Sequence, residues 1–143
     1  MQTRKNLLSL VLLIAPIAVL AAEPILTAST ETHSPDERIP AEEIVEAMLQ
    51  TAQPDDLESL ASCATEQGLT ATQTRSLFSS VVLPRLNATE RVHFLRPALQ
   101  PYCFTFYGAH LFRYWLIAER EQAGAKHYAV LWSGIGDAFE VLP

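Results

Sequence analysis

The sequence predicts an α+β fold in which about four short helices pack on one face of a C-terminal antiparallel β-meander of three to four strands. Residues 40 to 96 contain several short amphipathic segments, each preceded by a helix-capping residue or a proline. Residues 111 to 142 contain runs of aromatic and β-branched residues separated by short glycine-containing pieces. Helices followed by strands along the chain are typical of α+β architecture.

The first 22 residues have the three-part pattern of a secretory signal peptide. Arg4 and Lys5 form a basic region, residues 7–20 are apolar, and Ala21 and Ala22 provide small residues for cleavage. The apolar run is shorter than the roughly 20 residues that a membrane span needs, and it contains a proline, so we expect a cleaved leader rather than an anchor. This predicts a periplasmic or secreted protein with no membrane attachment after cleavage.

The remainder divides into two parts. Residues 23–38 are rich in Thr, Ser, Pro and Glu and carry few large apolar side chains, so we interpret them as a flexible leader. Residues 39–143 are expected to form a single α+β domain, since a chain of 143 residues with 49% hydrophobic residues can bury one core.

The charge balance limits the classes of partner. The formal net charge is −6, and loss of Arg4 and Lys5 leaves 8 of the 10 basic residues against 16 acidic ones, a charge of −8. Such a surface repels phosphate backbones and anionic lipids. We therefore expect no nucleic-acid or membrane partner, and a protein partner of basic character fits best.

Four helices are expected before residue 97. The first begins at Pro40 and buries a stripe from Ile44 to Leu49, and the second begins at Pro54 and ends at Gly68. The third is predicted from a capping box at residues 70–73, with a buried face that extends to Val82. The fourth follows a cap at residues 87–90 and includes Val92 and Leu95.

The last third of the chain is expected to form a hairpin. Its strands cover residues 112–120 and 126–132, and residues 138–142 add a third strand, with an extra one at 102–108. A turn at Ala123 and Gly124 would pair Trp115 with Trp132, Ile117 with Val130, and Arg120 with His127. A bulged turn would shift the register by one residue, and residues 111–124 also have the composition of a helix.

The chain contains two cysteines, Cys63 and Cys103. In an exported protein these are expected to form a disulfide that closes a loop of about 40 residues. Neither has the neighbouring cysteine of a Cys-x-x-Cys redox motif.

No motif for catalysis, metal binding or a cofactor is recognisable, so we expect none of these. His110 and His127 would lie roughly 33 Å apart along the strands, too far to share a metal. Ser133, His127 and Asp137 resemble a catalytic triad only by residue type, because the residues around Ser133 have the pattern of a turn.

The alternation of the hairpin suggests a binding face. We expect the face with Trp115, Ile117, Val130 and Trp132 to pack against the helices. The other face then has nothing to cover it, and exposed apolar patches with a polar rim mark interaction sites. The residues predicted to bind a partner on this face are Tyr114, Leu116, Arg120, His127 and Leu131.

The sequence therefore predicts an exported, non-catalytic protein-binding module, such as an inhibitor or an immunity-type partner of another protein. Two alternatives stay open. One is a small secreted hydrolase that uses His127 or His110. The other is a self-associating envelope protein, for which a homodimer is expected.

Overall fold

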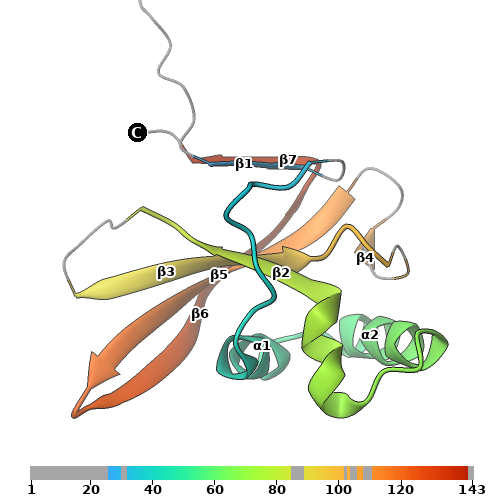
Figure 1. Cartoon of the computed structure of the whole chain (residues 1–143), viewed down its shortest axis with the longest axis horizontal. Coiled ribbons are helices and arrows are strands. Elements are labelled where there is room, and N and C mark those ends of the chain that lie inside the picture. The colour runs from blue at the N-terminus through green and yellow to red at the C-terminus, as the bar shows by residue number, and fades with distance from the viewer. Residues whose placement is uncertain are drawn as a thin grey trace, which may run out of the picture.

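The computed structural model has three layers (Figure 1). It describes residues 26–29, 32–84, 89–101, 103, 106–107 and 111–141. A central antiparallel sheet has helices on one face and a small two-stranded sheet on the other. The expected signal peptide lies outside the described residues. Within them, no helix is long and apolar enough to cross a membrane.

Two α-helices and one 3₁₀-helix precede most of the central sheet. They are α1 (Glu42–Leu49), α2 (Pro54–Glu66) and η1 (Ala71–Leu77). The strands are β1 (Leu26–Ser29), β2 (Phe78–Val82), β3 (Glu90–Pro97), β4 (Phe106–Tyr107), β5 (Leu111–Gln122), β6 (Ala125–Gly136) and β7 (Ala138–Val141). In the central sheet β3 and β6 flank β5, β2 lies outside β3, and β4 pairs with the first residues of β5. β1 and β7 form the second sheet.

The first core lies between the central sheet and the helices. Its largest buried side chain is Trp115, which contacts Phe78 edge to face with ring centroids 6.3 Å apart. Ile44 and Met48 of α1 face this core, as their helical spacing predicts. The predicted Cys63–Cys103 disulfide is present at the edge of this core.

The second core lies between the central sheet and the β1–β7 sheet. Leu26 and Ala28 of β1 are buried against Phe94 and Phe112 of the central sheet. Phe139 of β7 stacks on Phe94 with ring centroids 4.4 Å apart. The central sheet is therefore apolar on both faces, and each face has its own cover.

The prediction of four helices on a meander is wrong, although the mixture of helices and strands is confirmed. The capping box at Thr70 forms, since the Thr70 backbone N–H donates to the Gln73 side chain at 3.0 Å. It begins η1 only, and Phe78–Val82 continues as β2. The segment expected to be the fourth helix is β3.

The error has a physical cause in the burial of β2 and β3. β3 pairs with β2 on one side and β5 on the other, and residues 93–97 are buried in succession. A strand buried on both faces lacks the polar–apolar alternation by which strands are recognised. Strands are also favoured over helices by the β-branched residues in these segments, namely Val81, Val82 and Val92.

The hairpin is a strand pair, as predicted, and its turn lies at Ala123 and Gly124, which both have positive φ. The pairs Ile117–Val130 and Arg120–His127 are confirmed. Trp115 pairs with Ser133 instead of Trp132, because the register shifts between Leu116 and Ile117. Because of this bulge, each β6 residue after Leu131 lies on the face of the sheet opposite to the predicted one.

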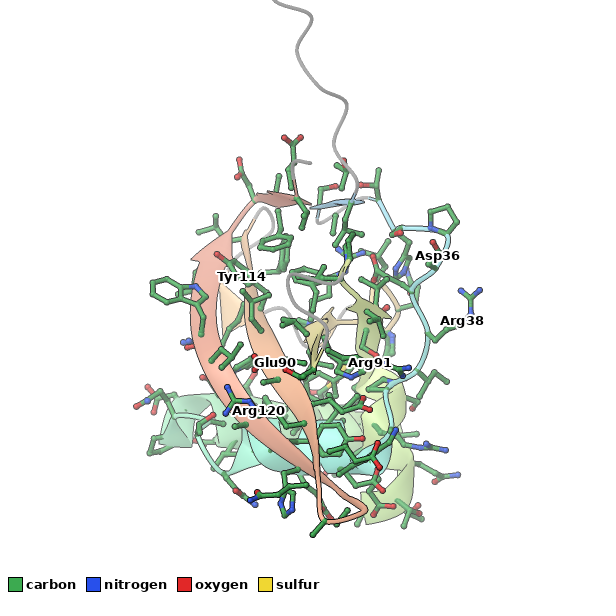
Figure 2. All side chains as sticks on the ribbon, turned by 90° about the vertical axis from the view of Figure 1, so that its left-hand side faces the viewer. Asp36, Arg38, Glu90, Arg91, Tyr114 and Arg120 are labelled. Atoms are coloured by element: carbon green, nitrogen blue, oxygen red, sulfur yellow. A yellow bond between two sulfur atoms is a disulfide. The ribbon has the colours of Figure 1, made fainter. Side chains whose placement is uncertain are left out.

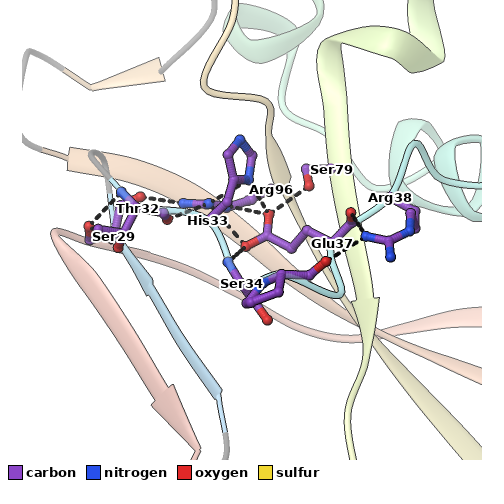
Figure 3. A network of polar contacts seen from close by, with 9 residues as sticks. Ser29, Thr32, His33, Ser34, Glu37, Arg38, Ser79 and Arg96 are labelled. Atoms are coloured by element: carbon purple, nitrogen blue, oxygen red, sulfur yellow. Dashed lines mark hydrogen bonds and ion pairs between the residues drawn. The ribbon is translucent and has the colours of Figure 1, made fainter.

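Part of the expected flexible leader belongs to the folded structure. Glu37 lies in a buried network with Arg96 of β3, whose guanidinium Nε donates to a Glu37 carboxylate oxygen at 2.9 Å (Figure 3). The same oxygen accepts a hydrogen bond from the Ser79 hydroxyl at 2.6 Å, and the other oxygen accepts one from the Ser34 backbone N–H at 2.9 Å. Hydrogen bonds to both carboxylate oxygens thus offset the free-energy cost of burying Glu37.

Arg96 also holds the chain that precedes Glu37. Its guanidinium donates to the carbonyl oxygens of Ser29 and Thr32, the latter at 2.7 Å. The guanidinium carbon lies 5.5 Å from the ring centre of Phe112. One side chain therefore connects Ser29, Thr32 and Glu37 to β3.

We expect Arg96→Met to lower the free energy of unfolding by about 3–5 kcal/mol, because it leaves the Glu37 carboxylate buried without its cation. Denaturant titration measures this loss. The double variant Arg96→Met with Glu37→Met should lose less than the sum of the two single variants. If the loss in the double variant equals the sum of the two single losses, the coupling between Arg96 and Glu37 is contradicted.

The same network predicts a pH dependence. Although burial raises the pKa of Glu37, the hydrogen bonds from Ser79, Arg96 and Ser34 outweigh it and lower the pKa. The stabilising contribution is complete above the ordinary carboxyl pKa and is lost as the pH falls through the lowered value. Glu37→Gln should therefore show a weaker loss of stability on acidification than the wild type.

Gly134→Ala is expected to destabilise the fold by about 1–3 kcal/mol. A Cβ at this position would lie 2.5 Å from the Tyr114 hydroxyl and 2.6 Å from its ring carbon. The Tyr114 ring cannot retreat freely, because it packs against Phe94 and Phe139. Thermal unfolding measures the effect, with Ser133→Ala on the exposed neighbour as the control. An unchanged midpoint would show that the ring is free to move.

Candidate functional site

The outer edge of β6 is the first candidate site. Among the described residues β6 pairs with β5 alone, so its other edge presents unpaired backbone N–H and C=O groups. Leu131, Trp132 and Ile135 on this strand are 49%, 59% and 45% exposed. We call the free backbone edge and these three side chains the β6 edge.

The bulge accounts for the exposure of Trp132. Trp132 pairs with Leu116 and therefore lies on the face of the second core, away from the helices. A Cβ on Gly134 would lie 2.9 Å from the indole Nε1 of Trp132, so the ring runs along β6 over this glycine. The indole is held beside the Tyr114 hydroxyl at the border of the core and remains largely open to solvent.

The expectation that nothing in the chain covers the second face is wrong. The β1–β7 sheet covers it, and Tyr114 and Leu116 are half-buried and pack against the second core. Tyr114 lies on the sheet below β1 and β7 (Figure 2). The reason is that the segment taken as a flexible leader contributes β1. Tyr114 and Leu116 therefore offer a partner only part of their surface.

The other three predicted binding residues are exposed. Leu131 lies at the β6 edge. Arg120 lies opposite His127 near the end of the hairpin, and its guanidinium forms an ion pair with Glu90 at 2.9 Å (Figure 2). The structure thus divides the predicted face into a partly covered portion and an exposed portion.

Sequence reasoning missed Trp132 and Ile135 as surface residues. Trp132 was expected in the helix-facing core, where an unbulged hairpin would have placed it. The available signal was the pair Gly134 and Gly136, since glycines within a strand often accompany bulges and close packing. They were interpreted as a turn, whereas both lie in β6.

A second candidate site is an open pocket of about 340 Å³ beside α1. Residues of β2, β3, β5 and β6 line it, together with Arg38 and Ala41. Its polar lining includes His93, Glu119, Lys126 and Tyr128. We call it the His93 pocket.

The His93 pocket contains a row of polar contacts that runs from a buried pair to an exposed lysine. His93 Nε2 lies 2.7 Å from one carboxylate oxygen of Glu119, and both side chains are about 90% buried. The other oxygen of Glu119 lies 2.9 Å from the ammonium of Lys126. The Tyr128 ring is centred 6.2 Å from the His93 ring.

These contacts favour the charged forms of Glu119 and Lys126. Burial raises the pKa of Glu119, but its hydrogen bonds with Lys126 and His93 outweigh this effect and lower the pKa. The same bond raises the pKa of Lys126. Glu119 is therefore ionised at neutral pH and accepts a hydrogen bond from His93 Nε2.

Neither site contains a metal-binding constellation. Within the described residues, no group of three or more His, Cys, Asp or Glu side chains could hold a metal ion. His127 is exposed, and His110 lies outside the described residues.

No family model, curated protein or solved structure matches this chain. The functional argument therefore rests on the two sites themselves.

Tyr128 provides a test of the electrostatics. Burial, followed by the negative charge of Glu119, raises the pKa of Tyr128 above its ordinary value. Glu119→Gln should lower this pKa, because the neutral amide no longer opposes the phenolate. Ultraviolet titration measures it, and Tyr128→Phe identifies the component that belongs to this residue. Persistence of that component in Tyr128→Phe would assign it to another tyrosine.

Proposed function

We propose that this protein is an exported, non-catalytic module that binds another protein through the β6 edge. The observation that carries the proposal is a long strand edge that no other described strand pairs with, together with exposed Leu131, Trp132 and Ile135. Natural proteins usually protect such edges or use them for pairing with another chain.

The edge offers two kinds of contact to a partner strand. Its backbone groups can extend the central sheet by one strand, which provides affinity through main-chain hydrogen bonds. The exposed side chains add apolar contacts, and an indole is among the side chains that contribute most to protein interfaces. The bulge at Leu131 interrupts the regular hydrogen-bond pattern and so selects the register of the incoming strand.

The charge of the protein favours a basic partner. The formal net charge is −6, and Asp137 and Glu140, just beyond the end of β6, are exposed. A positively charged partner would be steered toward this region. An inhibitor or immunity-type role fits this arrangement, because such proteins act by occupying a surface of their target.

Export is supported by two features. The first 22 residues have the pattern of a signal peptide, and the Cys63–Cys103 disulfide is suited to an oxidising compartment such as the periplasm or the cell exterior.

A matched pair of variants tests the proposal. Trp132→Asp should abolish recovery of a stoichiometric partner with the tagged protein from its native host, because it places a charge in the apolar contact. Ile39→Asp is the control, since Ile39 is 60% exposed and lies outside β6. Equal partner recovery by both variants, or no stoichiometric partner with the wild type, would contradict the proposal. A wild-type dimer in light scattering that Trp132→Asp dissociates would identify a second copy as the partner.

Neighbouring residues of β6 separate binding from folding. Leu131→Asp should weaken partner binding with a small loss of stability, because Leu131 is exposed. Val130→Asp should unfold the domain, because Val130 packs against the first core. Partner binding and thermal unfolding of both variants measure the two effects. A larger loss of stability for Leu131→Asp would contradict this assignment.

A further inference from the structure

The bulge divides β6 into two halves and reverses the alternation of side chains between them. Leu131 is the additional residue, because its neighbours Val130 and Trp132 pair with consecutive residues of β5. A regular strand places alternate residues on one face, and one additional residue reverses this assignment for the rest of the strand. Even-numbered residues before the bulge and odd-numbered residues after it therefore share a face.

The contacts of the two halves agree with this assignment. Four β6 side chains lie on the helix-facing side of the sheet, because they pack against the first core or pair with β5 residues that point toward the helices. They are Tyr128, Val130, Ser133 and Ile135. The side of the second core has Ala129 from the first half, and Trp132 and Gly134 from the second half.

This arrangement makes the β6 edge complementary to itself. In an antiparallel pair formed by two copies of one strand, residues that face each other must lie on the same side of the sheet. With a two-fold axis between Leu131 and Trp132, each half of β6 faces the other half of the second copy. Tyr128 then faces Ile135, and both lie on the helix-facing side. A regular strand could not pair in this register, because its facing residues would point to opposite sides.

The charges at the two ends of β6 are also complementary. Lys126 lies near the start of β6, Asp137 follows its last residue, and both are exposed. The Lys126 ammonium lies 2.9 Å from Glu119 and has further N–H donors, whereas Asp137 forms no ion pair with another described residue. The register described above places Lys126 of each copy opposite Asp137 of the other. Residues 128–136 between these ends carry no charge.

We propose that the β6 edge pairs with a second copy of this chain in an antiparallel, two-fold symmetric dimer centred between Leu131 and Trp132. This inference rests on the proposed use of the edge for strand pairing and names one occupant. β6 forms the rim of the central sheet, so the sheets of the two copies would join into one (Figure 1). The net charge of −6 on each copy opposes association. We therefore expect a reversible dimer, which competes with a basic partner for the same backbone groups.

Light scattering over a range of protein concentrations, followed by nuclear magnetic resonance of the dimer, tests the pairing. We expect a dimer with a nuclear Overhauser effect between the side chains of Tyr128 and Ile135. Within one strand these residues are seven positions apart, roughly 23 Å, so the signal arises only between copies. A protein that remains monomeric at millimolar concentration, or a dimer without this contact, overturns the inference. A monomer that still recovers its partner through Trp132 would overturn the dimer and leave the proposed function intact.

Charge reversals test the ends of the pairing. Asp137→Lys should weaken the dimer about tenfold, because it places like charges opposite each other at both ends. Glu140→Lys makes the same change in net charge on β7 and is the control, which should not weaken the dimer. Lys126→Glu alone should also weaken the dimer, and mixing it with Asp137→Lys should restore association, because unlike charges face each other in the mixed dimer.

Thermal unfolding shows whether the three variants fold. If Lys126→Glu does not fold, the comparison of Asp137→Lys with Glu140→Lys decides alone. Equal dimer affinities of these two variants overturn the inference, and so does a mixture that associates no better than its separate components.

Discussion

The ion pair between Arg96 and Glu37 is the contact on which the arrangement of the layers depends. Arg96 comes from the centre of β3, and its guanidinium binds Glu37 together with the carbonyls of Ser29 and Thr32. A charge buried in this way is tolerated only when its hydrogen-bonding groups are satisfied. These contacts join Ser29, the last residue of β1, and Thr32 to the centre of the sheet. β1 in turn pairs with β7 over the second face of the central sheet.

The bulge in the β5–β6 hairpin decides how the surface of the sheet is used. Before the bulge, Tyr128 and Val130 of β6 pack against the first core, as an alternating strand requires. After it, Trp132 lies on the opposite face, over Gly134 and beside Tyr114. One additional residue in a strand thus moves a large aromatic side chain from a core position to the surface. The same distortion supplies the apolar side chains of the proposed β6 edge.

The two polar networks of the central sheet differ in their exposure to solvent. Both oxygens of Glu37 accept hydrogen bonds from the protein, and the side chains of Glu37 and Arg96 are almost completely buried. Both oxygens of Glu119 also have partners, His93 and Lys126, but the Lys126 side chain is exposed and the network borders an open pocket. The Glu37 network therefore has a structural role within the fold, whereas the Glu119 network lies at the surface of the sheet.

The sequence by itself determined the features that depend on near neighbours or on residue type. These were the first two helices, the turn at Ala123 and Gly124, the pair Ile117–Val130, and the disulfide between the two cysteines present. Tertiary structure decided whether residues 78–97 would be helix or strand, because burial on both faces removed the alternation that identifies strands. It also decided the cover of the second face and the place of Trp132, since a contact between Arg96 and Glu37 and a bulge between paired strands join residues far apart in the chain. Local sequence patterns do not reveal such contacts, because these contacts stabilise the protein only after residues far apart in the chain have come together.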